Sequence, residues 1–442
     1  MLYWIYEIWQ QAISENADWA HNMRFLNLLQ YITIRAGLAC IMTFMLCVCC
    51  GQWVIRKLIS LKVGQPIRSA EEVHKLNELH GGKAGTPTMG GVMILGTVVI
   101  AVLICGRALN PFVAVTTCVM LALGLLGFID DYTKVKLKSS DGVSGKTKLF
   151  WQFTIGAIAA TFLYYKTQSM GYTLVKQPIA ISQITFPLFK TPIIDLGLFC
   201  IPFFAIIIVG CSNAVNLTDG LDGLAAGCTI TVALAYAVIA YLCGHFYMAN
   251  EYLFIPFNPH AQELGVFLMA LVGAGFGFLW HNCHPAKVFM GDTGSLAIGG
   301  ALSTAAICTK QELLLVVIGW VFVMEALSVI LQVGSFKLTG KRIFAMSPIH
   351  HHFELRGWHE KGRDWRDLAW WLHDHLAYSE IWFFPKLCAF NLVWRPQPHR
   401  TISSYMAPRG KLLASGEDPN ENQTERQARY ADFPPFCGID LP

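Results

Sequence analysis

The sequence predicts an all-α protein that crosses a membrane many times. Hydrophobic residues make up 54% of its 442 residues and charged residues only 14%, which is more apolar than a soluble domain of this length requires. The apolar residues gather in runs close to the roughly 20 residues that span a bilayer. The net charge of +4 is small, and no basic block is interleaved with aromatic residues, which excludes a nucleic-acid binder. We therefore expect a polytopic transmembrane helix bundle.

Nine apolar segments have the length and the low charge content of membrane spans. The first follows a mixed polar stretch, so we expect no cleaved signal peptide and a first span that stays in the protein. The predicted spans are Thr33–Ile55, Met89–Cys105, Leu109–Ile129, Leu149–Tyr165, Ile193–Cys211, Leu221–Cys243, Leu264–Trp280, Ser295–Cys308 and Leu313–Val333.

The positive charges concentrate on one side of the threaded chain. The loops after the first, third and ninth predicted spans are rich in Lys and Arg, whereas the loops between them are poor in both. The positive-inside rule places the basic loops in the cytoplasm and the N-terminus outside. In an outer loop, Tyr172 to Lys190 alternates apolar and polar residues, which predicts a short extracytoplasmic β-hairpin.

Two adjacent acids, Asp130 and Asp131, follow the third predicted span and precede the basic residues Lys134 and Lys148. The plain interpretation is that interfacial acids are solvated and paired with lysines. Adjacent carboxylates repel each other, however, unless a positive charge lies between them. A bound cation or a proton transfer at this position is the alternative.

Four polar residues recur at a spacing of three where the fifth predicted span ends. They are Asn213, Asn216, Asp219 and Asp222. This spacing predicts that they share one face of a helix. A helix cap would explain one of them, but it would not explain four on one stripe beside the bilayer, where ionisable groups are costly.

Asp292 lies between two glycines at the predicted start of the eighth span. Backbone N–H groups at such a position favour phosphate, and a carboxylate there can hold Mg²⁺ against it, so we rank Asp292 first among the acids as a metal ligand. A helix-start aspartate without a ligand is the plain alternative. A second loop, Lys83 to Gly91, has the glycines and threonines of an anion contact but also those of an ordinary turn.

The ninth span and the loop after it carry the remaining polar residues of interest. Glu325 lies among apolar residues, where either a function or a structural hydrogen bond would explain it. Three consecutive histidines, His350 to His352, cannot all point one way, which argues against a three-histidine zinc site. Binding of an anion or handling of a proton by one or two of them fits better.

These five stretches together resemble the phospho-N-acetylmuramoyl-pentapeptide transferase family, within the polyprenyl-phosphate N-acetylhexosamine-1-phosphate transferases, over roughly residues 30–358. The resemblance implies transfer from UDP-N-acetylmuramoyl-pentapeptide to undecaprenyl phosphate, which gives lipid I and UMP in the bacterial inner membrane, with Mg²⁺ as cofactor. The run Pro348 to Glu354 looks like the muramoyl-pentapeptide branch. The resemblance is also compatible with a homodimer.

The resemblance also implies roles for individual residues. Asp292 and Asp219 look like metal ligands, and Asp130 and Asp131 look like the pair at the reacting phosphates, with His350 among the catalytic residues. The expected substrate contacts are Lys83, Thr88, Lys134, Lys148, Asn216, Asp219, Asp222, Asn282, Phe289, Gly291, Gln332, His351 and His352. Direct attack by the lipid phosphate is favoured, and an aspartyl-phosphate intermediate is the competing mechanism.

The resemblance stops after Trp358, where the family would supply a tenth span. We expect a transmembrane transferase domain over residues 1–358 and a divergent polar tail over residues 359–442, for which a shifted reading frame is one explanation. The most apolar stretch of the tail, Ile381 to Trp394, contains Pro385 and Lys386 and is too short to cross a bilayer. Nine spans would leave the C-terminus in the cytoplasm.

Two other functions stay open. A sister transferase that uses UDP-N-acetylglucosamine would share most of these motifs. A transporter would also be polytopic and basic inside, but transporters place polar sites near the middle of the membrane. The acids of this chain gather at one membrane face, which disfavours a transporter.

Overall fold

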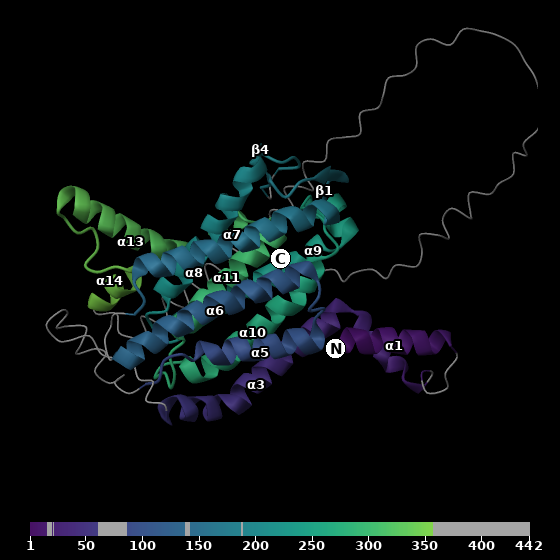
Figure 1. The fold of residues 1–442 in the computed structure, drawn as a ribbon, viewed down its shortest axis with the longest axis horizontal. Helices are drawn as coiled ribbons and strands as arrows, with labels where there is room; N and C mark the ends of the chain where they lie inside the picture. The colour runs from purple at the N-terminus through teal and green to yellow at the C-terminus, as the bar shows by residue number, and fades with distance from the viewer. Residues whose placement is uncertain (16–19, 21, 61–85, 138–141, 187–188, 357–442) are drawn as a thin grey trace, which may run out of the picture. The chain divides into compact units, whose positions relative to one another are not determined.

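The computed structural model describes residues 1–15, 20, 22–60, 86–137, 142–186 and 189–356, and most of them are helical (Figure 1). All of these residues belong to one compact unit. Lys83 and the predicted tail, residues 359–442, lie outside the described residues.

Long helices in one bundle form the framework of the fold. They are α3 (Ile32–Ser60), α5 (Gly91–Cys105), α6 (Pro111–Leu137), α7 (Gly145–Met170), α8 (Cys200–Thr218), α9 (Leu224–Cys243), α10 (Leu264–Asn282), α11 (Gly291–Cys308) and α13 (Trp320–Thr339). The shorter helices are α1 (Leu2–Ser14), α12 (Leu314–Ile318) and α14 (Ile349–Leu355), with 3-10 turns at Arg24–Gln30, Gly197–Phe199 and Ala261–Glu263 and a π-helix at Met248–Leu253. The strands are β1 (Tyr172–Leu174), β2 (Gln177–Ile179), β3 (Gln183–Ile184) and β4 (Ile194–Asp195).

Each predicted span overlaps one of the long helices, which confirms the all-α fold. Within the described residues, six helices are long and apolar enough to cross a membrane, namely α3, α6, α8, α9, α10 and α13. Helix α5 is apolar but shorter. The protein is therefore a multi-pass membrane protein, while the number of nine spans stays a prediction.

Some boundaries differ from the prediction for local reasons. Helix α8 begins at Cys200 rather than Ile193, because β4 and a turn at Gly197, with φ of 51°, come first. Helix α6 continues past the predicted end at Ile129, so Asp130 and Asp131 lie on the helix and not in a loop. Helix α1 was not predicted, because its polar side chains interrupt the apolar pattern.

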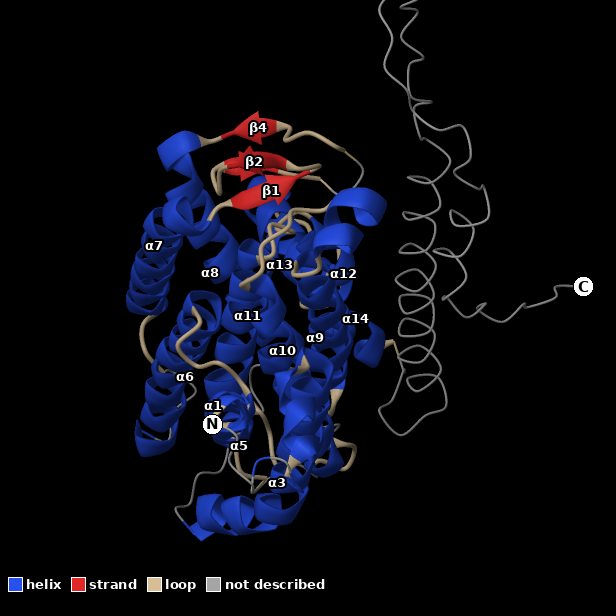
Figure 2. Ribbon diagram, turned by 90° about the vertical axis from the view of Figure 1, so that its right-hand side faces the viewer, coloured by secondary structure: helices blue, strands red, loops and turns tan. Residues whose placement is uncertain are grey.

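Among the described helices α11 is the most enclosed, and it packs against α5, α6, α8 and α9; Figure 2 shows it inside the bundle. Every residue from Thr293 to Cys308 is buried. Small residues allow this approach: Gly299 faces the backbone of Cys211 on α8, and Gly300 faces Leu123 on α6. Small residues at helix contacts are typical of membrane proteins, where close packing replaces much of the hydrophobic driving force.

Helices α3 and α10 pack in the same way. Gly273 of α10 faces the backbone of Cys40, and Gly277, one turn later, faces the backbone of Phe44. A side chain at either glycine would overlap α3. The glycine pair therefore sets how closely the first span lies against the centre of the bundle.

The β-strands cap one end of the bundle. Strands β1 and β2 pair as an antiparallel hairpin, and β3 pairs with β4, which confirms the predicted hairpin (Figure 2). The hydroxyl of Tyr172 donates to the carbonyl oxygen of Cys308 over 2.9 Å, and the buried ammonium of Lys310 donates to the carbonyl oxygens of Ile181 and Gln183. These bonds fix the strands to the end of α11.

A buried ion pair joins α3 to the start of α10. The two amino groups of Arg35 donate to the two carboxylate oxygens of Glu263 over 2.9 and 2.6 Å, and both side chains are almost completely buried. Arg35 also donates to the carbonyl oxygen of Cys105 at the end of α5, over 3.2 Å. One guanidinium thus holds three elements together.

We expect Glu263→Gln to destabilise the protein by about 3–5 kcal/mol, because it leaves the buried charge of Arg35 without its partner. The thermal unfolding midpoint of the detergent-solubilised protein measures this loss. The matched control is Glu7→Gln, since Glu7 lies 3.8 Å from Arg107 in a pair with both side chains exposed. Equal midpoints for the two variants would contradict the role given to the buried pair.

Candidate active site

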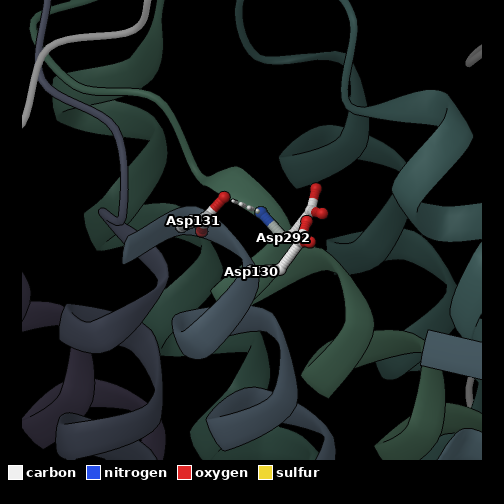
Figure 3. A group of neighbouring side chains, drawn as sticks. All are labelled: Asp130, Asp131 and Asp292. Carbon is white, nitrogen blue, oxygen red and sulfur yellow. Dashed lines mark hydrogen bonds between the residues drawn. The ribbon is translucent and has the colours of Figure 1, made fainter. Parts of the chain in front are cut away.

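Three carboxylates meet where the C-terminal part of α6 faces the start of α11. Asp130 and Asp131 come from α6 and Asp292 from the first turn of α11 (Figure 3). One oxygen of each lies within 4.8 Å of the others, a spacing at which the three could hold a metal ion. The sequence motifs that contain these acids are therefore brought together in space.

Asp131 orients the start of α11. Its carboxylate accepts hydrogen bonds from the backbone N–H groups of Asp292 (3.3 Å) and Thr293 (3.0 Å) and from the hydroxyl of Thr293 (2.8 Å). Figure 3 shows the first of these bonds. The first N–H groups of a helix have no partner within the helix, so a carboxylate there both satisfies them and fixes the direction of the helix.

Asp130 faces the other way, toward Asp292 and two lysines. Successive residues of a helix point about 100° apart, so adjacent acids on α6 have different neighbours. Lys134 lies 2.7 Å from Asp130 and 3.0 Å from Asp292, and Lys148 lies 2.7 Å from Asp292 and 3.5 Å from Asp130. The acids are thus paired with lysines, as the plain interpretation predicted. The same carboxylates are also close enough to one another to share a cation.

The predicted helical stripe at the end of α8 is wrong in part. Helix α8 ends at Thr218, so Asn213 and Asn216 lie on it, whereas Asp219 and Asp222 lie in the turn that follows. The backbone leaves helical geometry at Asp219, with ψ of 50°. Gly223, with φ of 80°, then adopts a left-handed conformation, so the chain cannot continue as one helix into α9.

The residues of this stripe point to different partners. The amide of Asn216 donates to Asp292 over 2.7 Å, and Asp219 accepts from the N–H of Gly291 over 3.1 Å. Asp222 instead lies 3.0 Å from a ring nitrogen of His284. Asn216 and Asp219 thus join the acidic cluster, and Asp222 supports the loop before α11.

Asp219 has a perturbed acidity. Desolvation, and then the nearby negative charge of Asp292, raise the pKa of the Asp219 carboxyl to about 7. The group is therefore partly protonated at neutral pH when no cation is beside it. A divalent cation in this cluster would favour the ionised form.

The loop before α5 lies directly against the start of α11. The N–H of Phe289 donates to the carbonyl oxygen of Pro87, and the N–H of Gly90 donates to that of Phe289. Between these bonds, Thr88 and Asp131 crowd Gly291, whose φ is 71°. Only glycine fits this position without strain, because a side chain there would meet both neighbours. Thr88 therefore lies at the start of α11 beside Asp131, and its role as a substrate contact stays a prediction.

The remaining predicted pocket residues brace loops in this structure. The amide of Asn282 donates to the carbonyl oxygen of Val288 and accepts from the N–H of Gly223. Gln332 bonds to the backbone of Ile343 and Phe344. Phe289 is half-buried. Their assignment as nucleoside contacts stays a prediction.

The three histidines point to three different partners, as expected. His350 lies 3.0 Å from Glu325, His351 lies 2.9 Å from Glu354, and His352 accepts from the N–H of Ala345. Their predicted catalytic and substrate-binding roles remain predictions.

Sequence reasoning missed two hydroxyls at the site. Thr293 bonds to Asp131, and Ser295 accepts from Asn216 over 2.8 Å while it donates to the carbonyl oxygen of Gly291. Both lie in the run from Gly291 to Ser295. Their proximity to Asp292 at a helix start, where side-chain hydroxyls commonly satisfy N–H groups, was the available signal.

Two segments of the chain match models of known protein families. Residues 113–310, which carry all three clustered aspartates, match the family described as Glycosyl transferase family 4. Residues 83–95 match phospho-N-acetylmuramoyl-pentapeptide-transferase signature 1. The described part of this segment, from residue 86 on, packs against the start of α11.

Two curated relatives define the family more closely. A phospho-N-acetylmuramoyl-pentapeptide-transferase of Methylacidiphilum infernorum (isolate V4) is 52% identical over 336 residues, which is 76% of this chain and 89% of the relative. One of Citrifermentans bemidjiense (strain ATCC BAA-1014 / DSM 16622 / JCM 12645 / Bem) is 47% identical over 338 residues, 76% of this chain and 90% of the relative. The chain belongs to the phospho-N-acetylmuramoyl-pentapeptide-transferase family.

We expect Gly127→Ala to lower both stability and transferase activity, because its methyl group would overlap the backbone carbonyl of Asp292 and push α6 away from α11. Overpacking of this kind costs about 1–3 kcal/mol. The thermal midpoint and the transfer rate measure the effect. The matched control is Gly210→Ala on α8, where the new methyl group meets nothing within 4 Å. If Gly127→Ala had wild-type stability and transfer rate, close packing of α6 against α11 at Gly127 would not be required.

Proposed function

We propose that this protein transfers phospho-N-acetylmuramoyl-pentapeptide from its UDP-linked precursor to undecaprenyl phosphate, which gives lipid I and UMP, the first membrane step of peptidoglycan synthesis. Membership of the family supports the reaction. The location of the reaction is inferred from one cluster of charged side chains. Its members are Asp130, Asp131, Asp292, Lys134 and Lys148. Phosphoryl transfer needs positioned charges of this kind more than it needs covalent chemistry.

Magnesium is the proposed cofactor. The cluster offers carboxylate oxygens, which are the ligands that Mg²⁺ prefers. A divalent cation there would offset the burial, and then the charge of Asp292, that raise the pKa of Asp219. Asp292 and Asp219 are the proposed ligands, with Asp130 and Asp131 beside them. When bound, the ion would neutralise charge on the pyrophosphate.

The protein's own groups would position the two phosphates. In the proposed direct reaction, an oxygen of the lipid phosphate bonds to the phosphorus that carries the sugar, and the bond from that phosphorus to UMP breaks. Asp130 helps to keep the lipid phosphate deprotonated. Lys134 and Lys148, now paired with carboxylates, are within reach of phosphate oxygens at the same place.

The proposed orientation puts the site in the cytoplasm of a bacterium. The basic loops support this orientation, since they flank the end of the bundle that holds the aspartates. Figure 1 shows α14 and β1 toward opposite ends of the bundle, so the β-strands would face outward. A homodimer in the inner membrane belongs to the same proposal.

We expect Asp292→Asn to reduce UMP release by about 10³-fold or more, because it removes a charge at the reacting phosphates. The assay contains undecaprenyl phosphate, UDP-N-acetylmuramoyl-pentapeptide and Mg²⁺. A chelator should abolish wild-type activity and added Mg²⁺ should restore it. The control is Asp195→Asn, an exposed acid on β4, which should keep wild-type activity.

Two results would overturn parts of the proposal. Full activity in Asp292→Asn would remove that residue from the site. UMP release only when UDP-N-acetylglucosamine replaces the muramoyl substrate would assign the chain to the sister reaction.

We expect a membrane-impermeant maleimide to label intact spheroplasts at position 195 but not at position 136. The test uses Asp195→Cys and Lys136→Cys, each in a background without other cysteines, and both positions are exposed. Lysed membranes should label at both. Labelling of position 136 in intact spheroplasts would reverse the proposed topology.

A further inference from the structure

Helix α13 makes little contact with the bundle, and what it buries includes a charged group. Its buried residues are Phe322, Glu325 and Ser328, which form one stripe at a spacing of three. An ionisable side chain inside a membrane helix is costly unless a partner satisfies it. The partner of Glu325 therefore indicates what the stripe is for.

That partner is the first of the three histidines. Nδ1 of His350, on α14, lies 3.0 Å from a carboxylate oxygen of Glu325, and both side chains are at most 3% exposed. A histidine whose Nδ1 is held by a carboxylate has a fixed ring orientation, which determines where Nε2 points.

Nε2 of His350 points at the loop between α8 and α9. This atom is buried and has no hydrogen-bond partner among the described residues. It lies so close to Gly220 that a side chain at that position would overlap it. Gly220 directly follows Asp219, which bonds to the N–H of Gly291 beside Asp292. A continuous series of contacts thus leads from Glu325 to the acidic cluster.

We propose that Glu325 is a positioning residue for the transfer reaction. It holds the His350 ring through Nδ1, and the ring edge that carries Nε2 sets the position of the Asp219–Asp222 turn. Glu325 itself does not touch the reacting phosphates. The inference rests on the proposed function, because the effect of this contact is measured on turnover.

The test compares two changes at the same carboxylate in the full-length protein. Glu325→Gln keeps an oxygen that can accept the Nδ1–H bond, and Glu325→Leu keeps the approximate volume without an acceptor. We expect Glu325→Leu to lower kcat for UMP release by about 100-fold, as a misplaced active-site group typically does, and to change KM for both substrates less than about threefold. Glu325→Gln should retain most of the wild-type kcat. Ser328→Ala, one turn along the same buried stripe, is the control that keeps wild-type kcat.

A second variant changes the other side of the contact between His350 and Gly220, in the loop between α8 and α9, and removes no charged group. Gly220→Ala should lower kcat at least about tenfold, because its methyl group must displace the His350 ring. The matched control is Gly227→Ala on α9, which meets nothing within 4 Å. This pair keeps the proposal testable if Glu325→Leu does not fold.

The outcomes separate the positioning role from the function. If Glu325→Leu or Gly220→Ala matches wild-type kcat, the positioning role is wrong although the transferase assignment stands. If Glu325→Gln lowered kcat as much as Glu325→Leu does, the positioning role would also be wrong. If wild-type protein and Ser328→Ala release no UMP, the proposed function is wrong and the positioning role falls with it.

Discussion

The hydrogen bonds that the Asp131 carboxylate accepts from the start of α11 are the contact on which the rest of the site depends. They join the C-terminal part of α6 to the first turn of α11 and thereby place Asp130 opposite Asp292. Gly127, one turn before Asp131, lets the two backbones meet. Because Asp131 and Thr293 are both buried, an N–H group left without a partner there would be costly, which favours this contact over an open arrangement.

The polar interactions divide between the two ends of the bundle. Arg35 and Lys310 make buried, structural contacts that fix helix starts and the β-strands. At the other end, Asp292 and its neighbours face two lysines that are only partly buried, and so remain accessible to charged ligands. A transporter would place such groups near the middle of the membrane. The separation of the two sets favours chemistry at a membrane surface.

The sequence predicted the features that follow from length and composition. Apolar runs located the long helices, and the glycines around Asp292 marked it as a candidate, which the structure places beside Asp130 and Asp131. The spacing of Asn216, Asp219 and Asp222 misled, because a repeat of three cannot show that the helix ends at Thr218, between the first and the second of them. Contacts between distant segments, such as Thr293 with Asp131 or Glu325 with His350, depend on how α11 and α14 pack, which no local pattern encodes.

The most direct test of the account is the affinity for a divalent cation when only the α6–α11 contact is weakened. Mn²⁺, a paramagnetic substitute for Mg²⁺, can be titrated into wild-type protein and into Thr293→Val, which removes one hydroxyl bond to Asp131 and no carboxylate. The account predicts binding of Mn²⁺ to wild type and affinity about 10- to 100-fold weaker in the variant. Equal affinity in both proteins would contradict the claim that this contact positions the carboxylates.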